Sequence, residues 1–231
     1  MMNALAIITA RGGSKRIPRK NVKLFLGKPI IEYSIEAALQ SGIFAEVMAS
    51  TDDEEIAEIA KKAGAEVPFF RSPETSNDFA TTADVILEVL QMYRERGQEF
   101  DAVCCIYPTA PFVTGDAIKT AMETLEREKA DTVLPVVRFS FPPQRCVMVK
   151  DGYLTAKWPE YMLMRSQDLE PLYHDCGQFY CLNTAQFLQQ KTIVMEKCVP
   201  YYQNEMNVQD IDTQEDWEMA ELKYRRMPPG K

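Results

Sequence analysis

The chain alternates short apolar segments with segments whose apolar residues recur at helical spacing, and this rhythm constrains its fold most strongly. Apolar runs typical of buried strands recur at residues 4–9, 46–50, 66–70, 101–107 and 132–137. Helical spacing separates these runs around residues 30–42, 54–63, 83–97 and 118–125. Strands that alternate with helices in this way build a mostly parallel sheet with helices on both faces.

The rhythm breaks after Arg138. Residues 139–176 lack it, and within them Asp151-Gly152 joins two short apolar stretches as a hairpin turn does. At 231 residues the chain has the length of one generous domain. We therefore expect a single Rossmann-like α/β domain over residues 1–231, with an inserted arm at about 139–176.

The pattern resumes beyond the insertion. A strand is expected at 178–182 and a last short strand at 206–211. Thr213, followed three residues later by Asp216, forms a capping box for a final helix.

Composition excludes several classes of protein. Hydrophobic residues make up 46%, enough for a full core. No apolar run approaches the roughly 18 residues that span a bilayer, and no secretory signal precedes the first strand, so we expect a soluble cytoplasmic protein. The six cysteines form no Cys-x-x-Cys pair, which favours buried free thiols over a zinc site. His174 is the only histidine, so multi-histidine metal sites are excluded.

Positive charge is concentrated in one segment. The net charge is −8, yet residues 11–23 hold six basic residues and no acidic one, which leaves −14 for the rest. A duplex nucleic-acid binder needs a broad basic face. A cationic loop on an acidic protein instead favours a focused site for a small polyanion.

The basic loop is the segment Ala10-Arg11-Gly12-Gly13-Ser14-Lys15-Arg16-Ile17-Pro18-Arg19-Lys20-Asn21. It follows the first strand, at the sheet edge where open α/β folds bind ligands. Its two glycines let the backbone approach a ligand closely, and its cations can neutralise phosphates. The spacing matches neither a Walker A loop nor a Gly-x-Gly-x-x-Gly fingerprint. The alternative is a solvated basic turn.

A second motif is Gln209-Asp210-Ile211-Asp212-Thr213. Alternation along a strand would place both carboxylates on one side. Two carboxylates can share one hard cation such as Mg²⁺ with substrate phosphates. The alternative is that these residues merely precede the final helix.

Together these motifs resemble the cytidylyltransferases that activate 2-keto-3-deoxy sugar acids, which include the CMP-sialic acid synthetases. The resemblance runs nearly end to end. It also covers Ser50-Thr51-Asp52, Arg71 with residues 78–82, and Tyr107-Pro108-Thr109-Ala110-Pro111. Residues 165–170 and 173–180 look most like the members that act on pseudaminic acid. The sialic acid enzymes typically carry a glutamine where this chain has Tyr107, which argues against sialic acid itself.

The resemblance implies a CTP-dependent reaction in which the anomeric hydroxyl of the sugar acid attacks the α-phosphate and pyrophosphate leaves. It implies nucleotide-binding residues Arg11, Gly12, Gly13, Ser14, Lys15, Lys20, Asn21, Arg71, Asp78, Ala80, Thr81 and Thr82. It implies that Asp210 and Asp212 hold Mg²⁺. Arg11, Lys15, Lys20 and these two aspartates would then be the catalytic residues, because phosphoryl-type transfer depends mainly on positioning and charge neutralisation.

The acceptor site follows less directly. A sugar acid is a carboxylate, so a guanidinium from Arg145 or Arg165 is the expected anchor. Tyr107, Gln144, His174 and Gln178 are candidates for contacts to hydroxyl or N-acyl groups, and each has a packing role as its alternative. The family resemblance also implies a homodimer in which the arm reaches across to the partner.

Other functions stay open at this point. The same chemistry can serve N-acetylneuraminic, legionaminic or 3-deoxy-manno-octulosonic acid. A nucleotide-binding module without catalysis is the alternative from another class, although such a module has no need for the pair Asp210 and Asp212.

Overall fold

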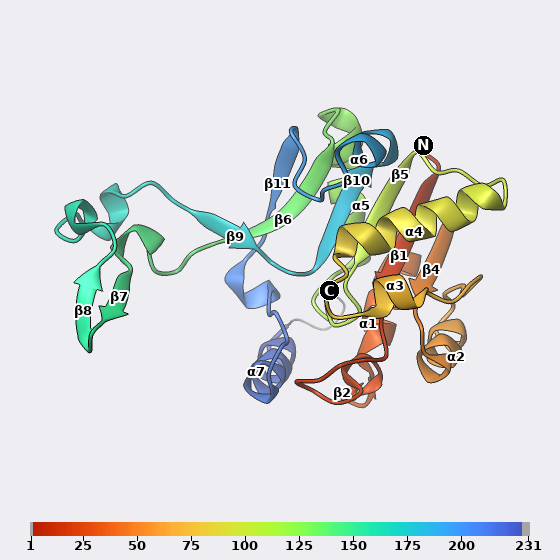
Figure 1. Cartoon of the computed structure of the whole chain (residues 1–231), viewed down its shortest axis with the longest axis horizontal. Helices are drawn as coiled ribbons and strands as arrows, with labels where there is room; N and C mark the ends of the chain where they lie inside the picture. Colours follow the sequence, from red (N-terminus) through yellow and green to blue (C-terminus); the bar gives the residue numbers. More distant parts are fainter. Residues whose placement is uncertain (1, 228–231) are drawn as a thin grey trace.

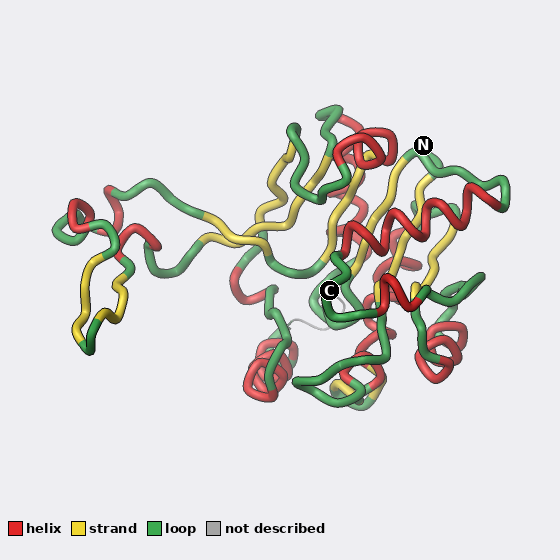
Figure 2. The backbone as a smooth tube through the Cα atoms, in the orientation of Figure 1, coloured by secondary structure: helices red, strands yellow, loops and turns green. Residues whose placement is uncertain are grey.

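The computed structural model describes residues 2–227 and has a mixed, mostly parallel sheet at its centre (Figures 1 and 2). Across these residues the sheet has seven strands in the order β11-β6-β10-β5-β1-β4, with β9 paired to β6. The strands are β1 (Ala4–Thr9), β4 (Glu46–Ser50), β5 (Ala102–Ile106), β6 (Thr132–Arg138), β9 (Tyr173–Asp175), β10 (Phe179–Asn183) and β11 (Cys198–Tyr202). The expected Rossmann-like α/β class is confirmed.

Helices cover both faces of this sheet. They are α1 (Ile30–Ser41), α2 (Glu54–Lys62), α3 (Pro73–Ser76), α4 (Thr82–Glu95), α5 (Gly115–Arg127), α6 (Thr184–Gln190) and α7 (Gln214–Tyr224). Short 3₁₀ turns are η1 (Lys20–Val22), η2 (Pro143–Arg145), η3 (Pro159–Tyr161), η4 (Ser166–Asp168) and η5 (Glu205–Asn207). No helix within residues 2–227 is long and apolar enough to span a membrane.

The expected helix boundaries are set by side-chain caps. The Asp53 carboxylate accepts from the Ile56 amide and begins α2. Thr213 and Asp216 form the predicted capping box of α7. Gly42 ends α1 in the left-handed conformation, with φ of 64°.

Alternate residues of β1 define the two layers of the core. Ala6 and Ile8 face one side and pack with α1, α2 and α5. Leu5 and Ile7 face the other side and pack with α4 and with Phe187 of α6. Burial on both faces explains why the strand reads as a continuous apolar run.

Strand β10 runs antiparallel to its neighbours β5 and β6, which the sequence did not indicate. It therefore begins at the edge where the parallel strands β1, β4, β5 and β6 end. Phe179, its first residue, pairs with Ile106, the last residue of β5. Residues just before β10 consequently share an edge with the loops that follow the parallel strands.

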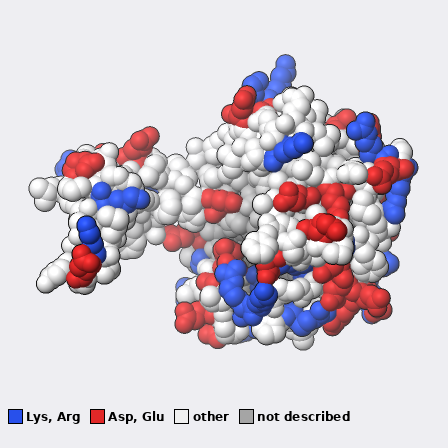
Figure 3. Space-filling view, viewed as in Figure 1, with Lys and Arg blue, Asp and Glu red and all other residues white. Residues whose placement is uncertain are grey.

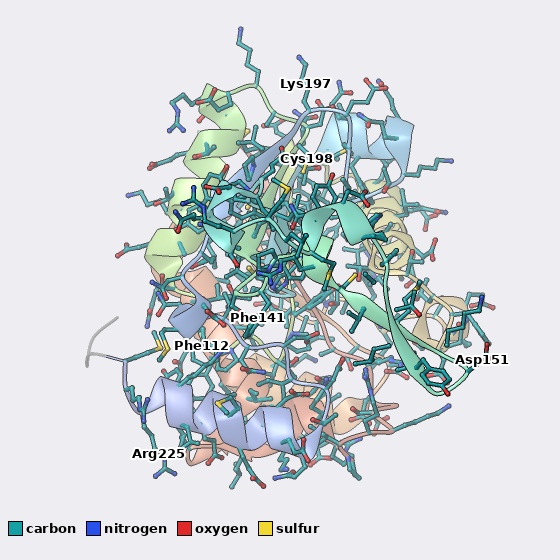
Figure 4. The ribbon with its side chains drawn as sticks, turned by 90° about the vertical axis from the view of Figure 1, so that its left-hand side faces the viewer. Phe112, Phe141, Asp151, Lys197, Cys198 and Arg225 are labelled. Carbon is teal, nitrogen blue, oxygen red and sulfur yellow. The ribbon has the colours of Figure 1, made fainter. Side chains whose placement is uncertain are left out.

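The inserted segment forms an arm that projects from the body (Figure 1). It leaves the end of β6 and returns through β9, and its outer part is the hairpin of β7 (Val147–Lys150) and β8 (Tyr153–Ala156). Asp151 lies at the tip of this hairpin (Figure 4), which confirms the expected turn. Several large apolar side chains of the arm are exposed, namely Phe141, Val149, Tyr153, Leu154 and Leu163.

Two strand predictions are wrong. Residues 66–70 alternate between buried and exposed, but Pro68 lacks an amide hydrogen, and only an isolated bridge between Met48 and Glu66 forms. Residues 206–211 contain the end of a 3₁₀ turn followed by irregular chain. Their buried residues Val208 and Ile211 are three positions apart, whereas a strand with one buried face would bury alternate residues.

Strands β9 and β11 and helices α3 and α6 lie where the sequence analysis expected no strand or helix. A small antiparallel pair, β2 (Leu24–Phe25) with β3 (Lys28–Pro29), follows the basic loop.

Candidate active site

A first hollow of about 390 Å³ lies at the carboxyl ends of β1 and β5. Most of its lining comes from the basic loop and from the residues after β5: Thr9, Arg11, Ser14, Lys15, Arg16, Lys20, Asn21, Asp78, Tyr107, Pro108 and Thr109. Open α/β sheets bind ligands at this edge. The basic loop and the Tyr107 segment thus line one hollow, although Tyr107 was expected among the acceptor contacts.

Gly12 is required by a close approach. Its amide donates to the Asp52 carboxylate at 2.8 Å. A Cβ atom at Gly12 would lie 2.8 Å from Oδ2 of Asp53, the cap of α2. Around Gly13, by contrast, no atom lies within 4 Å of the position that a Cβ would take. The backbone at Gly13 is therefore open to a ligand.

The cations of the loop are paired with carboxylates. Arg11 donates to Asp78 at 2.8 Å, and Lys15 also pairs with Asp78. Arg16 lies 2.7 Å and Lys20 3.5 Å from Asp212. In Figure 3, Lys and Arg side chains gather beside acidic ones on the lower part of the body. The pairs hold the cations in place, and the side chains of Lys15 and Arg16 stay mostly exposed to solvent.

Asn21 stabilises the backbone of the basic loop. It is buried, and its amide donates to the Arg11 carbonyl at 2.8 Å.

Arg71 is a buried guanidinium that lacks a full set of partners. Its Nε donates to the Ser50 hydroxyl at 3.1 Å, while its Nη2 is buried without a hydrogen-bond partner. Burial lowers its pKa, since desolvation disfavours the charged form. Such an atom is available to donate to an oxygen of a ligand or of water.

The segment at residues 77–82 closes the hollow beside Arg11. Asn77 accepts from the amides of Phe79 and Ala80, which fixes a tight turn. Thr81 caps α4 through a capping box with Asp84. The Thr82 hydroxyl lies 3.1 Å from that of Tyr107. The Thr81 side chain is thus used to cap α4, while the Thr82 hydroxyl contacts Tyr107, which lines the first hollow.

Asp210 and Asp212 flank the buried Ile211, although no strand forms there. Burial, and then the nearby charge of Asp212, raise the pKa of Asp210. Within residues 2–227 no side chain donates to the Asp210 carboxylate or forms an ion pair with it, whereas Asp212 faces Arg16 and Lys20.

These two carboxylates fit a hard cation. A carboxylate that resists ionisation gains from a cation, and its oxygens suit Mg²⁺. No group of three or more His, Cys, Asp or Glu residues within 2–227 could hold a metal. A cation here would complete its coordination with oxygen atoms of a substrate or of water.

A second hollow, of about 440 Å³, lies between the base of the arm and the Asp210 segment. It is lined by the end of β6, by β9, and by the chain between η5 and α7, and its charged residues are Arg138, Asp175, Glu205, Asp210, Asp212, Asp216 and Lys223. Asp212 belongs to this hollow and also pairs with cations of the first one. The two hollows therefore adjoin at Asp212.

The candidate acceptor residues fall into two groups. His174 lines the second hollow, where its Nδ1 lies 2.8 Å from the Asp175 carbonyl and its ring packs on Phe139. Gln178 is 1% exposed and donates to the Asn207 carbonyl at 2.9 Å, so it fixes the chain before Asp210. Its Oε1 is buried without a partner.

The arm candidates lie apart from both hollows. Gln144 donates to the Glu170 carbonyl, Arg145 to the Ser166 hydroxyl, and Arg165 to Asp168. All three partners belong to the arm itself. The structure therefore does not bring Arg145 or Arg165 to Asp210 within one chain.

Three residues of the site were missed by the sequence reasoning. Tyr180 donates to the Asp175 carboxylate at 2.6 Å and lies 3.5 Å from the Tyr107 hydroxyl. Arg138, at the carboxyl end of β6, lines the second hollow. The rule that strand ends carry ligand-binding residues could have selected Arg138. Asp175 and Tyr180 lie in the segment 173–180 that carries the resemblance, but their place beside Tyr107 depends on the pairing of β9 and of the antiparallel β10.

Comparison with known proteins gives a consistent result. A family model described as "Cytidylyltransferase" matches residues 5–216. The pseudaminic acid cytidylyltransferase of Campylobacter jejuni serotype O:2 is 41% identical over 225 residues, 97% of each chain. The CMP-N,N'-diacetyllegionaminic acid synthase of Legionella pneumophila is 34% identical over 227 residues, 95% of each chain.

Solved structures share the fold. A CMP:2-keto-3-deoxy-manno-octonic acid synthetase complexed with CTP superposes with a TM-score of 0.69 at 19% identity, covering 97% of this chain and 100% of the other. The 4-diphosphocytidyl-2C-methyl-D-erythritol synthase of Anaerococcus prevotii gives 0.63 at 15% identity, covering 97% and 99%.

Proposed function

Because this chain belongs to the cytidylyltransferase family, we propose that it transfers the cytidylyl group of CTP to the anomeric hydroxyl of pseudaminic acid. The products are CMP-pseudaminic acid and pyrophosphate. The observation that carries the substrate assignment is 41% identity over 97% of both chains with an enzyme named for that acid. The cationic first hollow beside a pair of carboxylates supports the reaction type.

The first hollow is the proposed triphosphate site. Arg11, Lys15 and Lys20 neutralise the phosphates, and the open backbone at Gly13 lets them approach closely. Charge on the phosphate oxygens grows as pyrophosphate leaves, so cations fixed by the loop stabilise the transition state more than the ground state. Ser14 and Asn21 complete the lining.

The base and ribose are assigned to Arg71 and the residues from Phe79 to Thr82, whereas Asp78 pairs with the cations of the triphosphate site. The unpartnered Nη2 of Arg71 supports this assignment, since a nucleotide oxygen would satisfy it. The Ala80 amide donates to Asn77 in a fixed turn, which leaves its carbonyl to accept from the amino group of cytosine. A site whose polar groups are matched to cytosine rejects uracil, because the exchanged groups leave buried atoms unpaired.

Asp210 and Asp212 are the proposed Mg²⁺ ligands. When bound, Mg²⁺ would balance charge on the phosphate oxygens and favour ionisation of the attacking hydroxyl. Lys20 donates to the Ile211 carbonyl, so it ties the basic loop to the aspartate segment. This contact fixes the position of the basic loop relative to Asp210 and Asp212.

The acceptor is assigned to the second hollow. His174 lines this hollow and Tyr107 lines the adjoining first hollow, while Gln178 holds the chain before Asp210. Gln144, Arg145 and Arg165 belong to the arm, so they would serve the site of a partner subunit.

We propose that the protein is a homodimer joined through the arm. Phe141 is 85% exposed and Leu163 98%, and apolar side chains of this kind gain from burial against a second copy. Light scattering of the full chain should give twice the mass of one chain. A cytoplasmic location is proposed as well, since CTP is a cytoplasmic nucleotide.

One experiment tests the function directly. The protein is incubated with CTP, Mg²⁺ and a panel of pseudaminic, legionaminic, N-acetylneuraminic and 3-deoxy-manno-octulosonic acids, and products are identified by mass spectrometry. CMP-pseudaminic acid should form fastest, and UTP should be a poor donor. Faster turnover of legionaminic acid would reassign the substrate. Absence of pyrophosphate release with every acid would support a non-catalytic nucleotide-binding module instead.

A further inference from the structure

We propose that Arg138 binds the carboxylate of the acceptor and thereby places the anomeric hydroxyl for attack. This inference rests on the proposed function and identifies a residue of that same site. Arg138 is the last residue of β6, where it pairs in register with Tyr173 of β9.

The position of Arg138 suits this role. It lines the second hollow together with Asp210 and Asp212. In a 2-keto sugar acid, the carboxylate is attached to the carbon that bears the reacting hydroxyl. The group that binds the carboxylate must therefore lie beside the triphosphate and the metal ligands. Arg138 meets this condition within one chain, whereas Arg145 and Arg165 contact only arm residues.

The guanidinium of Arg138 is also available. Lys223, the other cation that lines this hollow, donates to the carbonyls of Glu205 and Val208 at 3.1 and 2.8 Å. The neighbouring cations Arg16 and Lys20 face Asp212. Among residues 2–227 no ion pair or side-chain hydrogen bond engages Arg138, which is exposed at the rim of the hollow.

The charge of the hollow favours such a cation. Its other charged residues are mostly acidic: Asp175, Glu205, Asp210, Asp212 and Asp216. An anionic acceptor would be repelled by this set unless a cation met its carboxylate. A guanidinium presents two parallel N–H groups, which match the two oxygens of a carboxylate.

The test compares wild type with Arg138→Gln, which keeps length and polarity and removes the charge. We expect the KM for pseudaminic acid to rise about tenfold to a hundredfold, with the KM for CTP changed less than about twofold. Calorimetry with the acid in the presence of CMP should show the same loss of affinity without requiring turnover. Arg138→Lys keeps the charge but not the two parallel N–H groups, so its KM for pseudaminic acid should lie between those of wild type and Arg138→Gln.

A second substrate makes the assignment specific. The carboxamide of the acid has the same shape but no charge. Wild type should prefer the acid over the carboxamide by about the factor that Arg138→Gln loses, and the variant should treat both alike. Arg127→Gln, at an exposed arginine of α5, is the matched control and should keep the preference of wild type. Arg145→Gln and Arg165→Gln test whether the arm supplies the anchor instead.

The outcomes separate the two proposals. If Arg138→Gln still prefers the acid as wild type does, the carboxylate is not bound by Arg138. If Arg165→Gln or Arg145→Gln abolishes the preference instead, the anchor comes from the arm of a partner. If wild type itself forms no CMP product, the proposed function fails, while the calorimetric comparison still decides whether Arg138 binds the acid.

Discussion

The carboxylate of Asp78 accepts a hydrogen bond from the Arg11 guanidinium at 2.8 Å, inside the hollow assigned to the triphosphate. The same carboxylate pairs with Lys15. These contacts lower the pKa of Asp78, with the hydrogen bond from Lys15 as the largest cause, so it is ionised at any physiological pH. A triphosphate that binds these cations must displace an internal anion.

Removing that anion should strengthen nucleotide binding. Asp78→Asn keeps the shape of the side chain and frees two cations. Because Arg11 and Lys15 are then no longer partly neutralised, CTP should bind about threefold to tenfold more tightly by calorimetry. Asp151→Asn, at the tip of the arm, is the control. Weaker CTP binding would mean that Asp78 orients the two cations for the nucleotide.

The cations themselves should matter for catalysis and little for folding. Lys15 is 79% exposed, so Lys15→Ala should leave the melting temperature nearly unchanged. The KM for CTP should rise at least about tenfold in Lys15→Ala and Arg11→Ala, because each change removes a charge-assisted contact to phosphate. Lys61→Ala, on the exposed face of α2, is the matched control. Near-normal turnover at limiting CTP in either variant would contradict the phosphate assignment.

The metal pair should affect turnover. Asp210→Asn and Asp212→Asn are nearly isosteric and leave the Thr213 cap intact. If both hold Mg²⁺, at least one variant should lose about a hundredfold in kcat, roughly 2.7 kcal/mol of transition-state stabilisation. Added Mg²⁺ should restore part of the loss. Full activity of both variants at low Mg²⁺ would leave these residues with only a role before α7.

The buried thiols should make stability depend on alkaline pH. Burial raises the pKa of Cys105 to about 12, whereas the unfolded chain ionises near 9.0. Between these values the folded state holds more protons than the unfolded state, so the free energy of unfolding falls as pH rises. The slope reaches about 1.4 kcal/mol per pH unit for each such group.

Urea unfolding from pH 8 to 10.5 measures this slope. Cys105→Ala should flatten it, while Cys146→Ala, at an exposed thiol, should not. Equal slopes in all three proteins would show that other groups govern the alkaline loss of stability.

The basic loop and the helix ends could be predicted because their signals are local. A cap such as Asp53 and a glycine such as Gly42 act within a few residues of the chain. The two glycines of the loop likewise followed a strand, which fixed their place at the sheet edge. The direction of β10 could not be predicted, since it depends on pairing with β5 and β6, which are distant in sequence.

The segment of Asp210 and Asp212 was also predicted only in part. The sequence identified its residues, but the strand predicted for them does not form. Ile211 is buried against Phe25 and Trp217, which come from segments almost two hundred residues apart. One buried side chain of this kind fixes a loop without any ladder of hydrogen bonds. Arg138 was overlooked for a related reason, because the hollow that it lines is built by β9 and the chain before α7.

The ends of the arm are neighbours, since Arg138 pairs with Tyr173 across β6 and β9. The body therefore holds the whole excursion as one closed loop between adjacent positions. Closing a longer loop adds only about 0.6 kcal/mol for each doubling of its length. Evolution can consequently lengthen, shorten or replace the arm without altering the residues that line the first hollow. Such changes could alter the acceptor or the partner of the enzyme while its nucleotide site stays the same.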